Sequence, residues 1–120
     1  MDRMTALPAP DWKSLSHSSP LLAALPGNVR RLTRLVEMAR KAILFSRGDR
    51  PKAMFYVIAG EVRLVRRSQS GVEIVLQRTR RGFLAEASLD QPQYHCDAVA
   101  AETSSILILP RAALRDALEN

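Results

Sequence analysis

The chain changes from helix-like to strand-like patterning near residue 42. Before this point, apolar side chains recur three or four positions apart. After it, short apolar runs alternate with polar residues and end at glycine or proline. Recurrence every three or four positions favours helix, whereas alternation favours half-buried strands. The sequence therefore predicts helices first and a β-rich body after them.

Two helices are predicted ahead of the β-rich body. Ser18 or Ser19 followed by Pro20 is a helix start, because serine caps a helix and proline suits its first position. Asn28 then predicts the cap of a longer helix of about three turns. The apolar stripe of that longer helix consists of Val29, Leu32, Leu35, Val36 and Ala39.

The β-rich body consists of short strands between turn signals. Strands are predicted over residues 43–45, 54–58, 62–65, 72–77, 97–101 and 105–109, with turns at 47–49 and 68–71. Residues 85–89 predict one helical turn that Pro92 ends, and residues 111–119 predict a final helix. Many short strands with helices only at the two ends predict a mainly β, antiparallel sandwich or roll with flanking helices.

The first 19 residues contain several prolines and serines and few apolar side chains to anchor the backbone. They predict a flexible N-terminal arm. At 120 residues and 13.4 kDa, the rest of the chain suits one domain over residues 20–120.

The chain is basic, with 18 Lys and Arg against 12 Asp and Glu and a net charge of +6. This excess suggests nucleic acid or an anionic ligand. Residues 1–80 hold 15 basic and 6 acidic side chains, whereas residues 81–120 hold 3 basic and 6 acidic ones. The basic charge therefore belongs to the early part of the chain.

Composition excludes several classes of protein. No apolar run reaches the ~18 residues that span a bilayer, and the N-terminus lacks the apolar stretch of a secretory signal. The single cysteine, Cys96, forms no internal disulfide, which favours a reducing, cytoplasmic setting. Two histidines and no catalytic motif argue against a histidine-rich metal site and against an enzyme.

Three motifs, in this order, resemble the sensor domain of the CRP/FNR regulators, over roughly residues 20–120. Residues 45–49, Phe-Ser-Arg-Gly-Asp, are similar to the F-x-x-G-D turn of that family. Residues 55–62 are similar to its aromatic-V-x-x-G-x-V strand pair, and residues 106–111 to its last strand and exit helix. The resemblance implies the cyclic nucleotide-binding fold, an antiparallel double-stranded β-helix or jelly-roll-like β-roll.

The resemblance also implies a ligand cassette at residues 82–98. In nucleotide-binding members a Gly-Glu pair opens a short helix and the Glu holds the ribose. Leu84 leads into this position here, Ala85 replaces the Gly, and Glu86 keeps the acid. Tyr94 is expected either to stack on a ligand ring or to plug an empty pocket.

Further along the cassette, the family places Arg, a hydroxyl residue and Ala at the cyclic phosphate. Counting from Glu86 puts His95, Cys96 and Asp97 at these positions. A histidine does not match the two-pronged grip of Arg on phosphate, and Asp97 adds a negative charge. A haem sensor is the less favoured alternative, because adjacent strand residues such as His95 and Cys96 point to opposite faces.

Three functions therefore stay open. The first is an effector-sensing regulatory domain with a non-standard pocket. The second is a genuine cAMP- or cGMP-binding domain, and the third is a protein-interaction scaffold with a vestigial pocket. The resemblance implies a small-molecule effector and a homodimer through the C-terminal helix. The helix-turn-helix DNA reader of the family is not in these 120 residues, so we expect no direct nucleic acid contact by this chain, and no membrane contact.

Overall fold

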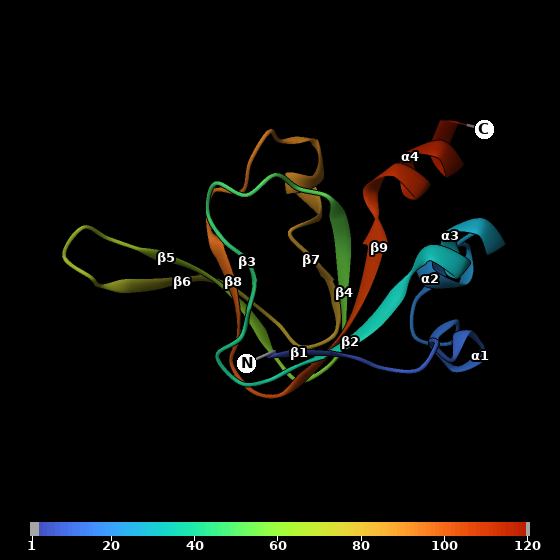
Figure 1. The fold of residues 1–120 in the computed structure, drawn as a ribbon, viewed down its shortest axis with the longest axis horizontal. Helices are drawn as coiled ribbons and strands as arrows, with labels where there is room; N and C mark the ends of the chain where they lie inside the picture. The colour runs from blue at the N-terminus through green and yellow to red at the C-terminus, as the bar shows by residue number, and fades with distance from the viewer. Residues whose placement is uncertain (1–2, 120) are drawn as a thin grey trace.

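Two antiparallel sheets face each other and form a β-roll, with helices gathered at one end (Figure 1). The computed structural model describes residues 3–119, apart from the side chains of residues 86–87 and 117–119. Within this part, the first sheet runs in the order β1 (Met4–Ala6), β2 (Arg34–Met38), β9 (Ser104–Pro110), β4 (Ala53–Ala59) and β7 (Gly82–Leu84). The second sheet runs in the order β3 (Ile43–Phe45), β8 (Asp97–Ala100), β5 (Val62–Arg67) and β6 (Glu73–Thr79).

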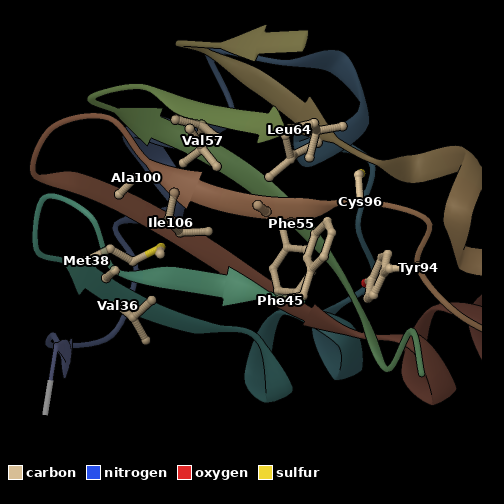
Figure 2. Close-up of a cluster of buried hydrophobic side chains, with 14 residues drawn as sticks. Val36, Met38, Phe45, Phe55, Val57, Leu64, Tyr94, Cys96, Ala100 and Ile106 are labelled. Carbon is tan, nitrogen blue, oxygen red and sulfur yellow. The ribbon is translucent and has the colours of Figure 1, made fainter. Parts of the chain in front are cut away.

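This architecture confirms the mainly β, antiparallel roll with flanking helices. The predicted strands all appear, with bounds that differ by one or two residues at some ends. Between the sheets lies a hydrophobic core to which both sheets contribute, including Met38, Val57, Leu64 and Ile106 (Figure 2). Burial alternates along β8 and along the inner part of β2, whereas β4 is buried on both faces and β6 is exposed up to Thr79.

The helices cover the outer face of the first sheet. They are α1 (Trp12–Leu15), α2 (Pro20–Ala23), α3 (Gly27–Leu32) and α4 (Arg111–Glu119). Leu22 of α2 and Val29 of α3 are fully buried in a second cluster with Leu107 and Leu109 of β9. The predicted start of α2 is confirmed, because the Ser19 side chain accepts a hydrogen bond from the backbone N–H of Leu22.

The longer helix predicted from Asn28 is wrong. α3 begins one residue before Asn28 and ends at Leu32, and the chain then becomes extended and enters β2. Along β2, Val36 and Met38 are buried while Glu37 between them is exposed, which is strand periodicity. Pairing of β2 with β9 satisfies the backbone along the whole strand, and this tertiary pairing outweighs the helical spacing of the apolar residues.

The first 19 residues contain two elements that were not anticipated. β1 pairs with β2, and α1 buries Leu15 against the helices. The Asp11 side chain caps α1 by accepting a hydrogen bond from the backbone N–H of Ser14. Elements of three and four residues carry too little periodicity to be recognised from sequence. The division of the chain at residue 19 stays a prediction.

The turn between β4 and β5 requires glycine. Gly60 has φ +88°, and a Cβ there would overlap the side chain of Ser104 and the backbone at Thr103. The Ser104 hydroxyl oxygen in turn accepts a hydrogen bond from the backbone N–H of Glu61 at 3.1 Å. This close approach joins the two sheets at one corner of the roll, and it explains the glycine of the second motif.

Candidate ligand-binding site

The segment expected to form the ligand cassette lies between β7 and β8. A 3-10 helix, η1 (Glu86–Asp90), occupies the place of the predicted helical turn. Ala85 precedes it with φ 53° and ψ 33°, in the left-handed region. That region costs an alanine free energy but is open to glycine. Ala85 therefore has the backbone conformation that would suit glycine, the residue that it replaces in the family motif.

Side chains from this segment separate into buried and exposed positions. Leu84, Tyr94 and Cys96 are buried in the core between the sheets, and Ala85 packs against that core. His95 is exposed. The structure therefore brings Leu84, Ala85, Tyr94 and Cys96 together and leaves His95 outside. The side chain of Glu86 lies outside the described residues, so its role stays a prediction.

The ring of Tyr94 fills the core beside the cassette. It stacks on Phe45 with ring centroids 3.6 Å apart and planes 10° apart. Phe45 in turn stacks on Phe55 at 5.8 Å and 28°. Figure 2 shows these three rings together at one end of the core. Phe45 and Phe55 were noted in the sequence only as parts of family motifs, and alternation along β3 and β4 was the available signal that they face inward.

Backbone hydrogen bonds tie Tyr94 to the turn after β3. The Tyr94 N–H donates to the carbonyl of Asp49, and the Gly48 N–H donates to the carbonyl of Tyr94, both at 2.9 Å. Asp97 reinforces this contact, because its carboxylate accepts a hydrogen bond from the Arg47 N–H at 2.7 Å. Asp97 thus binds the turn of the F-x-x-G-D motif to the end of the cassette.

Burial keeps the two titratable groups of this core neutral. It raises the pKa of Tyr94 to about 12, helped by the nearby Asp49 carboxylate and Cys96. It also raises the pKa of the Cys96 thiol, with a smaller contribution from Asp97. A protonated thiol is a poor nucleophile and a poor metal ligand. No group of three or more metal-ligating side chains occurs among the described residues.

A family model described as a cyclic nucleotide-binding domain matches residues 35–120. The chain belongs to this family. Members of the cyclic nucleotide-binding domain family with solved structures include transcriptional regulators of the CRP/FNR type, as the motifs implied. The β-roll described above is therefore the cyclic nucleotide-binding fold.

Three solved structures show how similar the fold is. The sensor domain of the transcriptional regulator DNR from Pseudomonas aeruginosa is 26% identical, with a TM-score of 0.80 over 90% of this chain and 77% of that one. The N-terminal domain of a Streptomyces coelicolor transcriptional regulator is 28% identical, with a TM-score of 0.67 over 84% and 75% of the two chains. The Thermus thermophilus Catabolite Activator Protein is 28% identical, with a TM-score of 0.67 over 84% and 50%.

The share of each relative that this chain covers differs among them. It covers 51% of a longer DNR structure, so it spans about half the length of such regulators. Comparison with curated protein sequences gave no match. None of the described helices is long and apolar enough to cross a bilayer.

Proposed function

We propose that this domain senses a small effector through a pocket that differs from the ordinary cyclic nucleotide site. The supporting observation is that residues 82–98 contain no Lys or Arg, while the ring of Tyr94 occupies the core beside them. Burial removes the hydration of a cyclic phosphate, and without a cation no ion pair would offset that cost in free energy. The effector is therefore expected to differ from a cyclic nucleotide, and no haem or metal is required.

Calorimetry with cyclic AMP and cyclic GMP tests this proposal. We expect no saturable heat at micromolar concentrations of either nucleotide. The alternative, a genuine cyclic nucleotide-binding domain, places Glu86 on the ribose. Micromolar binding that Glu86→Ala abolishes and Glu73→Ala leaves intact would establish that alternative, because Glu73 lies on β6, outside the cassette.

The buried Tyr94 ring favours a second candidate function, a protein-interaction scaffold with a vestigial pocket. A ligand that binds only the folded state raises the melting temperature, and the rise grows with the logarithm of the ligand concentration above its Kd. A thermal-shift survey of small metabolites therefore separates the two functions. Stabilisation by a compound, reduced in Tyr94→Phe or Tyr94→Leu, supports a sensor, whereas an unresponsive domain supports the scaffold.

In the same proposal, α4 carries the output of the sensor. The backbone N–H of Arg111, the first residue of α4, donates to the Lys52 carbonyl at 2.9 Å. Lys52 lies in the loop after β3, and that loop is bound to Tyr94 through Asp49. Tyr94 and the start of α4 are thus connected through residues 49–52, with one backbone hydrogen bond at each end of that segment. We propose that α4 continues into a pairing helix between two copies in a cytoplasmic, dimeric regulator.

A further inference from the structure

A cleft of about 430 Å³ opens at the edge of the roll, outside the cassette helix. It lies between β3 and the first sheet, and the loop that joins β3 to β4 closes one side. The residues that line it are Met4, Arg34, Leu44, Phe45, Asp49, Arg50, Lys52, Ala53, Phe55, Tyr94 and Ile108. Its volume lies within the range of small-molecule sites, about 300–1,000 Å³.

The inner wall of the cleft is apolar and formed by largely buried aromatic rings. Phe45, Phe55 and Tyr94 form the aromatic stack described above, and all three line the cleft. Figure 2 shows these rings at one end of the core. The Tyr94 hydroxyl forms no hydrogen bond with any described residue, although it stays protonated at neutral pH. The wall thus presents the accessible edges of these rings and one hydrogen-bond donor.

The rim of the cleft is positively charged. Arg34 at the start of β2, and Arg50 and Lys52 in the loop, are exposed and form no ion pair with any described residue. By contrast, Arg63 and Arg80 both pair with Glu61. The one carboxylate on the rim, Asp49, already accepts a hydrogen bond from the Ser46 N–H at 2.9 Å. Three unpaired cations therefore face one engaged anion.

We infer that this cleft binds a small organic anion with a flat apolar body, of the aromatic carboxylate class. The aromatic wall would bury the body, and the carboxylate would lie on the rim between Arg34 and Arg50. Guanidinium groups hold carboxylates through two parallel hydrogen bonds, and an apolar wall strengthens such contacts by excluding water. Tyr94 of the cassette lines this cleft, but η1 and Glu86 do not, so the inference does not require the cassette to bind a nucleotide.

A titration with naphthoate, monitored by two-dimensional NMR of the backbone amides, tests the site. We expect saturable chemical-shift changes at the amides of residues 49–53 and 94. The uncharged isostere naphthamide should bind more weakly than naphthoate by roughly tenfold or more. The double substitution Arg34→Gln and Arg50→Gln should weaken naphthoate binding by roughly tenfold or more. These side chains are exposed, so the fold is expected to survive.

Arg47→Gln is the matched control. Arg47 is exposed, carries the same charge and lies in the same loop, but it does not line the cleft. We expect it to change naphthoate affinity by less than about twofold. Equal binding of naphthoate and naphthamide overturns the inference, and so does a loss in Arg47→Gln as large as in the double variant. Shifts confined to the cassette residues 84–90 would also overturn it.

Discussion

At Ala85 the backbone holds an alanine in the left-handed region, at φ 53° and ψ 33°. This conformation costs an L-residue about 1–2 kcal/mol, whereas glycine costs about 0.4–1 kcal/mol through the entropy of the unfolded chain. Ala85→Gly is therefore expected to raise the free energy of unfolding by roughly 0.5–1 kcal/mol, measured by urea denaturation. Ala112→Gly, on the exposed side of α4, is the control and should lower it by about 1 kcal/mol. A less stable Ala85→Gly variant would contradict this account of the cassette.

At the scale of the element, the turn between β4 and β5 depends on a close approach that the hairpin turn between β5 and β6 lacks. Gly60 and Gly71 have similar φ values, +88° and +86°, so a side chain strains both backbones alike. A Cβ at Gly60 also overlaps Ser104, whereas nothing lies within 4 Å of one at Gly71. We expect Gly71→Ala to cost about 1–2 kcal/mol and Gly60→Ala about 2–3 kcal/mol more, in chemical denaturation. Equal losses in the two variants would show that the contact with Ser104 does not hold the corner.

The elements also show what sequence alone could predict. Strands such as β4 and β5 were predictable, because dense β-forming runs ended at glycines that the turns require. β2 was not, because Val36 falls both on the apolar stripe of a helix and on the inward face of a strand. Only its pairing with β9, far along the chain, decides between the two.

The candidate site was predictable to a similar extent. The family motif placed Ala85 at the start of the cassette helix, and alternation placed His95 and Cys96 on opposite sides. The stack of Tyr94 on Phe45 was not predictable, because the two rings meet only when β3 pairs with β8 and the turn binds the cassette. The same holds for the cationic rim of the cleft, whose members come from separate elements.

At the scale of the whole molecule, the excess of positive charge makes the carboxylates important. The chain has 18 Lys and Arg against 12 Asp and Glu, so acid removes the charges that oppose the excess. Glu61 is a buried carboxylate with two ion pairs among the described residues. Its side chain is 7% exposed and pairs with Arg63 at 2.5 Å and Arg80 at 3.1 Å. Arg80 also lies 3.7 Å from Glu102, so the pairs form a network around one corner of the roll.

The hydrogen bond from Arg63, with the positive charges of Arg63 and Arg80, lowers the pKa of Glu61 below its ordinary 4.5. A carboxyl with a lowered pKa in the folded state stabilises it above the unfolded pKa, and this stabilisation is lost as the pH falls through the folded pKa. We therefore expect Glu61→Gln to lower the melting temperature at neutral pH, and the difference from wild type to shrink below about pH 4.5. Glu73→Gln, in the exposed pair with Arg67 at 3.5 Å, should leave the profile nearly unchanged. Circular dichroism melts between neutral pH and pH 3 measure both variants, and a Glu61→Gln deficit that stays constant with pH would rule out ionisation of Glu61 as its cause.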